Sequence, residues 1–146
     1  MPRIKINLPK TFNFSTQTNL RVSDINYSGH LGNDAVLSLI HEARLRFLEQ
    51  YGYDEYNLAG VGLIMVDCAN IYKSEGFYGD LIEMQVAIDD FTKHSFDLFY
   101  RLKNIKTGKD LVHAKTRMVC FDYQARKIQL LPPIFRNIFE KEASER

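Results

Sequence analysis

The chain has 146 residues, of which 45% are hydrophobic and 25% charged, with a formal net charge of +1. This length suits one domain whose core needs no disulfide or metal, and the near-zero charge gives no indication of nucleic-acid or membrane binding. No apolar run resembles a signal peptide or reaches membrane-spanning length. We therefore predict a single soluble, cytoplasmic domain over residues 1–146.

The two cysteines occur in separate strand-like apolar runs. Cys68 and Cys120 belong to no CxxC motif and to no cluster of cysteine and histidine. This placement favours reduced core thiols over a disulfide or a metal site. The sequence thus predicts no metal ligands.

The chain begins with an irregular segment and continues into a strand. Pro2 and Pro9 interrupt any regular ladder, so residues 1–13 are predicted to form an N-terminal arm. Residues 14–25 are rich in threonine, valine and aromatic side chains, which favours a first strand.

A long helix is predicted next, from Asp34 to Tyr51. Asn33 or Asp34 is expected to cap its start, and Gly52 is expected to end it. Its apolar residues recur at helical spacing on more than one side, which predicts a helix buried on most faces. They are Val36, Leu37, Leu39, Ile40, Ala43, Leu45, Phe47 and Leu48.

Four further strands follow, joined by short turns. Polar and apolar residues alternate in most of them, as in antiparallel strands with one buried face. The predicted ranges are 63–72, 82–89, 96–103 and 110–122. Two prolines end this region, and residues 133–146 are predicted to form a C-terminal helix and tail. An α+β fold satisfies this order, with an antiparallel sheet wrapped around a long central helix.

A polar stretch lies between the first strand and the long helix. Residues 23–34 contain two carboxylates, two asparagines and a histidine, with glycines at 29 and 32. The free N–H groups at a helix start attract negative charge, so this stretch is the predicted site of chemistry.

These residues resemble the hotdog-fold acyl-CoA thioesterases of the 4-hydroxybenzoyl-CoA thioesterase type. That family has Asp-x-Asp, then Gly-His-x-Asn-Asn, then a helix with a Glu-x-Ala-Arg-like segment. The counterparts here are Asp24-Ile25-Asn26, Gly29-His30-Leu31-Gly32-Asn33 and Glu42-Ala43-Arg44. The similarity continues through residues 72–80 to Leu131-Pro132, and it implies the hotdog fold.

The resemblance implies hydrolysis of an acyl-CoA or acyl carrier protein thioester, without a metal or redox cofactor. The family's usual catalytic aspartate falls on Asn26, whose amide cannot accept a proton from water near neutral pH. Asn26 is therefore predicted to orient the substrate or a water, with His30 or Asp24 as the base. The residues expected to bind the substrate are Gly29, Leu31, Gly32 and Asn33. Their backbone N–H groups can donate to the substrate, and the two glycines allow the substrate to approach the backbone closely.

Two other functions fit the same residues. The first is an inactive protein that only binds acyl thioesters, since Asn26 replaces the carboxylate. The second is a hotdog hydratase or dehydratase, although the Gly-rich and Pro-rich segment of those enzymes is missing. The resemblance also implies a homodimer or homotetramer. The predicted fold agrees with this, since a single curled sheet leaves an edge that another copy can cover.

Overall fold

The computed structural model describes residues 3–145, so the first two residues and the last residue of the predicted domain lie outside the described part. All six strands form one antiparallel sheet in the order β1-β3-β4-β5-β2, with β6 paired to β5. Their bounds are β1 Phe14–Asn19, β2 Gly62–Tyr72, β3 Leu81–Asp89, β4 Ser95–Asn104, β5 Asp110–Asp122 and β6 Lys127–Ile128. The sequence did not predict β6.

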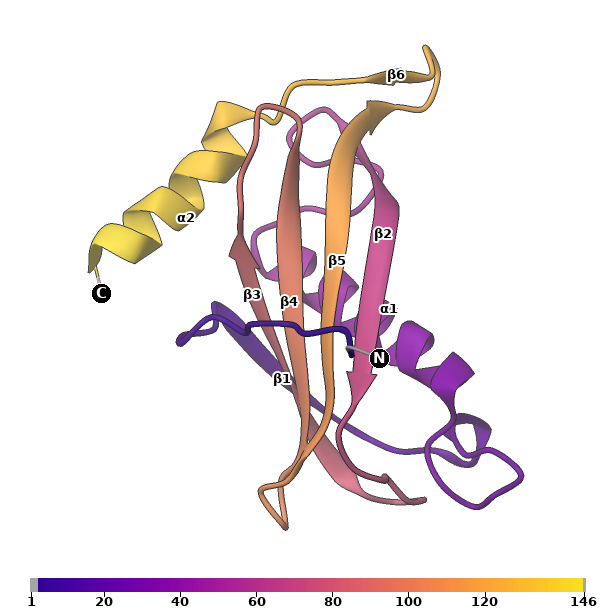
Figure 1. Ribbon diagram of the computed structural model, residues 1–146. Helices are drawn as coiled ribbons and strands as arrows, with labels where there is room; N and C mark the ends of the chain where they lie inside the picture. The colour runs from indigo at the N-terminus through magenta and orange to yellow at the C-terminus, as the bar shows by residue number, and fades with distance from the viewer. Residues whose placement is uncertain (1–2, 146) are drawn as a thin grey trace.

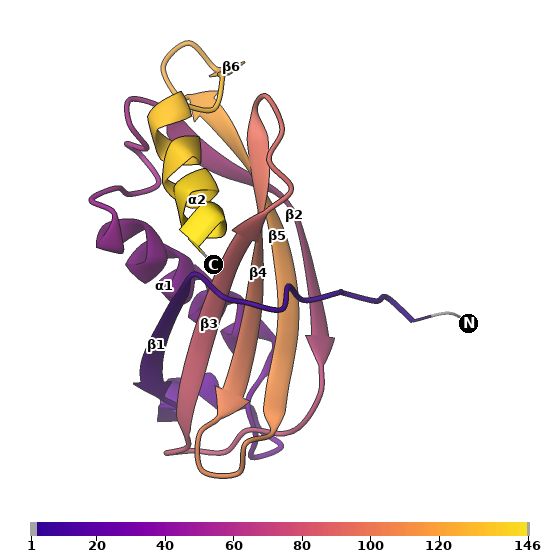
Figure 2. The same ribbon diagram turned by 90° about the vertical axis from the view of Figure 1, so that its left-hand side faces the viewer.

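Two helices lie on one face of this sheet. They are α1 (Asn33–Gln50) and α2 (Pro133–Glu145), and Figures 1 and 2 show both of them on the same side. The arm that precedes β1 leaves the sheet on the opposite side (Figure 2). The predicted α+β arrangement, an antiparallel sheet wrapped around a long helix, is therefore confirmed.

The strand β5 shows how the alternating pattern sets the two faces of the sheet. On the outer face, Lys115 Nζ lies 2.9 Å from Asp67 Oδ1, and Arg117 Nε lies 3.0 Å from Asp97 Oδ1. The positive side chains of this strand are thus paired across neighbouring strands. The inner face is apolar apart from one threonine and packs toward α1, with Val112, Ala114, Thr116, Met118 and Cys120 buried.

The first strand is shorter than the sequence suggested. It ends at Asn19, and a 3-10 helix, η1, occupies Val22–Asp24, so the prediction of a strand through residue 25 is wrong. The reason is local: Asp24 Oδ2 accepts a 2.8 Å hydrogen bond from the backbone N–H of Arg21. That bond favours a turn over an extended chain.

The start of α1 also differs from the prediction. Gly32 is the N-cap and makes no side-chain capping bond, whereas Asn33 and Asp34 are already helical. The prediction that Asn33 or Asp34 caps the helix is therefore wrong. A Cβ atom at Gly32 would lie 2.7 Å from Asp34 Oδ1, so a larger residue there would require the exposed Asp34 side chain to move.

The end of α1 follows the expected glycine signal. Gly52 has a φ of +82°, and its N–H bonds the carbonyl of Glu49 at 2.9 Å. The N–H of Tyr53 bonds the carbonyl of Leu48 at 3.0 Å. This pair of bonds is the Schellman arrangement, which requires a left-handed residue after the helix.

Burial of α1 is one-sided. Val36, Ile40 and Phe47 are each at most 1% exposed, but Leu37 is 48% and Leu45 37% exposed. The prediction that α1 is covered on most faces is therefore wrong within the described chain. Leu37 instead lines a groove of about 230 Å³ with Met65 of β2, a strand at the edge of the sheet.

A buried arginine ties α1 to the sheet. Arg44 is 5% exposed, and its guanidinium donates to Tyr100 Oη at 3.2 Å and to Glu55 Oε2 at 3.3 Å. Tyr100 Oη in turn lies 2.8 Å from Thr116 Oγ1 on β5. Burial raises the pKa of Tyr100, so its phenol stays neutral in this network.

Candidate active site

The loop that leads into α1 is a tight turn. Ile25 pairs with Leu31 as an isolated antiparallel bridge, and the N–H of Asn26 donates to the His30 carbonyl at 2.9 Å. Gly29 has a φ of +88°, a conformation that side chains with a Cβ rarely adopt. The turn therefore has a defined shape, and it brings His30 to the start of the helix.

Asn26 shapes this turn through its side chain. Its Oδ1 accepts the backbone N–H of Ser28 at 3.0 Å and that of His30 at 3.4 Å. These are the bonds of an Asx turn. The amide oxygen of Asn26 is thus already engaged within the loop.

Asp24 has a similar local role. The residue is 4% exposed, and its Oδ2 accepts the Arg21 N–H and lies 3.7 Å from Arg21 Nε. Asp24 also contributes its carbonyl oxygen, which accepts the N–H of Gly32 at 3.0 Å. Its contacts therefore hold the chain between η1 and α1.

The backbone donors of the loop are largely in use. Gly29, His30, Leu31 and Gly32 all donate their N–H groups to acceptors in the protein. The donors left for a ligand are thus those of the first turn of α1, from Asn33 onward, because these have no acceptor within a helix.

A cavity of about 210 Å³ opens at this end of α1. Three of the predicted residues line it: His30, Leu31 and Asn33. Asn26, Asp24, Gly29 and Gly32 do not line the cavity and instead form the loop behind it. The structure therefore divides the predicted set into residues that face the cavity and residues that position the loop.

The other wall comes from the segment that follows β2, which the sequence did not identify as part of the site. Tyr72, Lys73, Ser74 and Glu75 line the cavity, together with Val36 of α1 and with Leu111 and Val112 of β5. The N–H of Leu31 bonds the Gly76 carbonyl at 2.7 Å and joins the two walls. The only sequence signal here was the similarity over residues 72–80, which gave no side-chain role.

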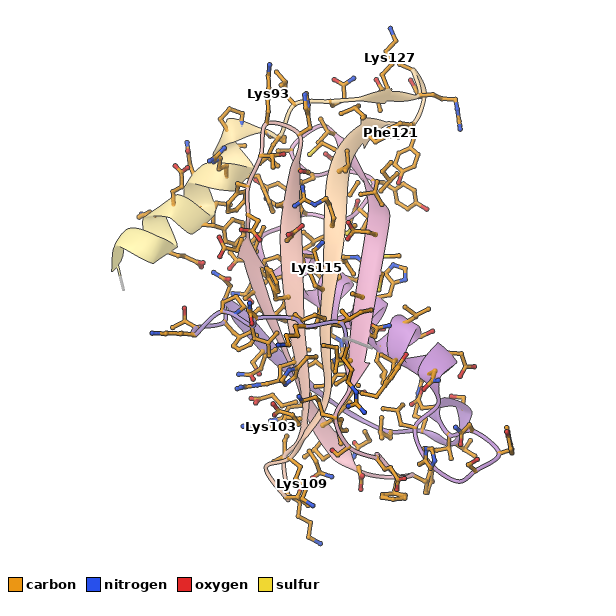
Figure 3. All side chains as sticks on the ribbon, in the orientation of Figure 1. Lys93, Lys103, Lys109, Lys115, Phe121 and Lys127 are labelled. Atoms are coloured by element: carbon orange, nitrogen blue, oxygen red, sulfur yellow. The ribbon has the colours of Figure 1, made fainter. Side chains whose placement is uncertain are left out.

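A second cavity of about 450 Å³ adjoins the first. Both cavities are lined by Ser74, Glu75 and Leu111, and the second extends to Lys106 and Lys109 in the β4–β5 turn. Figure 1 shows the loop before α1, the end of β2 and this turn at the same end of the sheet. Figure 3 places Lys109 at that turn, at the opposite end of the sheet from Lys127.

The sheet, the helix across it and the cavity at the helix start together define a hotdog-type fold. Residues 20–139 match the model of the thioesterase-like superfamily, so the chain belongs to that superfamily. Within residues 3–145, no helix is long and apolar enough to cross a membrane. No curated protein shows significant sequence similarity to the chain.

Solved structures show the same fold. A 1,4-dihydroxy-2-naphthoyl-CoA thioesterase from Synechocystis has a TM-score of 0.75 at 21% identity, over 82% of this chain and 89% of that one. A DHNA-CoA thioesterase from Staphylococcus aureus has a TM-score of 0.76 at 17% identity, over 89% and 88%. A thioesterase-superfamily protein from Jannaschia has a TM-score of 0.80 at 17% identity, over 90% and 83%.

Proposed function

We propose that the protein hydrolyses acyl thioesters of coenzyme A or of acyl carrier protein to a free acid and a thiol. The observation that carries this proposal is the cavity at the start of α1, which combines His30 and Asn33 in a member of the thioesterase-like superfamily. Hydrolysis needs a group that moves a proton and donors aimed at the developing oxyanion. The imidazole and the first turn of α1 meet these two needs.

His30 is the residue to which we assign direct contact with the thioester or the attacking water. Asp24, the alternative, is buried and bonded to Arg21, away from the cavity. Asn26 acts indirectly, because its amide oxygen accepts a hydrogen bond from the backbone N–H of His30 and so positions that residue. The substrate-binding role falls to Leu31 and Asn33, with Gly29 and Gly32 giving the loop its shape.

Release of free thiol from a panel of acyl-CoAs, from acetyl to long-chain and aromatic, tests this proposal. Replacement of His30 by alanine should lower kcat/KM by about a thousandfold for the best substrate, as expected for a direct acid–base group. His94→Ala is the matched control, because that imidazole lies 2.9 Å from the Gln129 carbonyl oxygen and lines neither cavity. A loss of less than tenfold in His30→Ala would exclude His30 from the chemistry.

The second candidate function is thioester binding without hydrolysis. Asn26 favours it, since an amide replaces the family's carboxylate and its oxygen already bonds two N–H groups. Calorimetric binding of acyl-CoA by a wild-type protein that releases no thiol would select this function.

We also propose that the protein works as a homodimer through β2. This edge strand carries Met65 and Val66 at 47% and 52% exposure, and Leu37 of α1 faces the same groove as Met65. Exposed apolar groups beside an unpaired strand edge are suited to a second copy related by a two-fold axis. A two-fold axis would pair the strand with its own copy in antiparallel fashion.

A further inference from the structure

Backbone hydrogen bonds hold the segment around Glu75, between β2 and β3, in a fixed place. The N–H of Lys73 bonds the Leu111 carbonyl at 2.8 Å, and Ser74 Oγ donates to the Asp110 carbonyl at 2.6 Å. On the other side, the Gly76 carbonyl accepts the Leu31 N–H. Glu75 is therefore anchored between β5 and the loop before α1 by bonds on both sides of it.

Glu75 is the acidic residue that borders both cavities. The three residues common to the two linings are Ser74, Glu75 and Leu111. Of these, Leu111 is apolar and the Ser74 hydroxyl is bonded to Asp110. Within residues 3–145, the exposed Glu75 carboxylate has neither a hydrogen bond nor an ion pair. Its oxygens remain available to water or substrate.

Both cavities have mixed polar and apolar linings, but each offers groups that suit one half of an acyl thioester. The first has the apolar walls Leu31, Val36 and Val112, which suit an acyl group. The second has Lys106 and Lys109, which suit the phosphates of a phosphopantetheine carrier. A thioester that occupies both cavities has its carbonyl carbon and sulfur where the two meet, beside Glu75.

We propose that Glu75 is the catalytic carboxylate of this site and replaces the one missing at Asn26. This inference rests on the proposed hydrolysis. The Glu75 carboxylate accepts a proton from water as the water oxygen bonds to the thioester carbonyl carbon. With Glu75 as the proton acceptor, the role of His30 changes from proton transfer to hydrogen bonding: His30 and the first turn of α1 donate to the carbonyl oxygen as it becomes negative. The C–S bond then breaks, the proton passes from Glu75 to the sulfur, and acid and thiol leave.

The test is the steady-state kinetics of Glu75→Gln on the best acyl-CoA of the panel. The amide keeps the shape and removes the proton acceptor, so kcat should fall by about 100- to 10,000-fold while KM changes less than threefold. Glu49→Gln is the matched control, an exposed glutamate on α1 outside both cavities, and should retain wild-type kcat. Melting temperatures of both variants should equal that of the wild type.

A second measurement separates proton acceptance from packing. Formate should restore part of the activity of Glu75→Ala, because a small carboxylate can occupy the vacated space. A kcat within threefold of wild type in Glu75→Gln, a rise in KM alone, or no effect of formate would overturn the assignment to Glu75. Wild-type protein that releases no thiol from any acyl-CoA or acyl carrier protein thioester would instead overturn the hydrolysis itself, and the role of Glu75 with it.

Discussion

The backbone N–H of Leu31 donates a 2.7 Å hydrogen bond to the carbonyl oxygen of Gly76. This bond joins the loop before α1 to the segment after β2, and His30 and Glu75 are the residues that directly precede the two bonded positions. Two residues far apart in the sequence are thereby held on the wall of one cavity. The spacing between them depends on how closely the two backbones approach.

Gly76→Val should disturb this approach. A Cβ at Gly76 would lie 2.8 Å from Leu20 Cδ1 and 3.3 Å from Leu31 Cβ, so the branched side chain overpacks the contact. We expect a loss of about 1–3 kcal/mol in the free energy of unfolding, measured in urea, and a fall in kcat/KM. Gly76→Ala should lose less, because the Leu20 methyl can move. Equal stability of Gly76→Val and wild type would contradict the tight contact.

Two substitutions of Asn26 should show whether its side-chain oxygen stabilises the loop. Asn26→Asp keeps an oxygen for the N–H groups of Ser28 and His30, so its unfolding free energy should stay within about 0.5 kcal/mol of wild type. Asn26→Ala leaves these donors unpaired and should cost about 1 kcal/mol. It should also lower kcat/KM, since His30 loses its anchor. Urea unfolding and thiol release measure both effects, and equal stability of the two variants would argue against the Asx turn.

Two arginines on α1 allow a matched comparison of buried and exposed ion pairs. Arg44→Ala removes the guanidinium from a buried network, leaving Glu55 with His41 and Tyr100 with Thr116, and should lower the unfolding free energy by about 3 kcal/mol. Arg46 is partly exposed, pairs with Glu42 at 2.8 Å and also donates to Thr16 Oγ1 and the Gln17 carbonyl on β1, so Arg46→Ala should cost about 1–2 kcal/mol, less than Arg44→Ala. Chemical denaturation of both variants measures the difference. Losses of the same size would show that the Arg44 network contributes little.

The buried thiol of Cys120 should make stability depend on pH in the alkaline range. Burial raises the pKa of Cys120 from 9.0 to about 11. Between these values the folded state keeps a proton that the unfolded state has lost, so stability falls as pH rises. By pH 10.5, wild type should lose about 2 kcal/mol that Cys120→Ala does not lose. The check is urea unfolding of both proteins at pH 8 and 10.5, and parallel pH profiles would refute the shift.

Lysines on the edge of β2 should separate the proposed dimer. The double variant Met65→Lys/Val66→Lys places two charges where a second copy would pack, so light scattering should give the mass of one chain. Ile134→Lys is the control, because Ile134 on α2 is 63% exposed and far along the chain from β2. A wild type that is already monomeric at working concentration would count against the dimer.

The four long strands β2 to β5 were predictable because one face of the sheet is apolar. β5 runs over Asp110–Asp122, as its alternation indicates, since each second side chain must be buried under α1. The length of the first strand was overestimated. Its last residues are also favourable for a strand, but the bond between Asp24 and the Arg21 N–H turns the chain after Asn19.

The candidate site was only half predictable. The loop with Asn26 and His30 is a local feature, and its residues and their resemblance to a known family indicate it directly. The opposite wall includes residues 72–75, which the Leu31–Gly76 bond joins to the loop. No periodicity in a single sequence indicates such a distant contact. Nothing in the sequence therefore predicted that Glu75 lines the same cavity as His30.

The strand order has a consequence for the way the molecule is assembled. β3, β4 and β5 follow one another as neighbours, whereas β1 and β2 are added at the two outer edges. Closing those edges brings together residues far apart in sequence, which slows folding and favours the contiguous meander as the early structure. The cavity forms where the segments after β1 and β2 meet. We therefore expect newly made chains to acquire ligand recognition last, after both edge strands have joined the sheet.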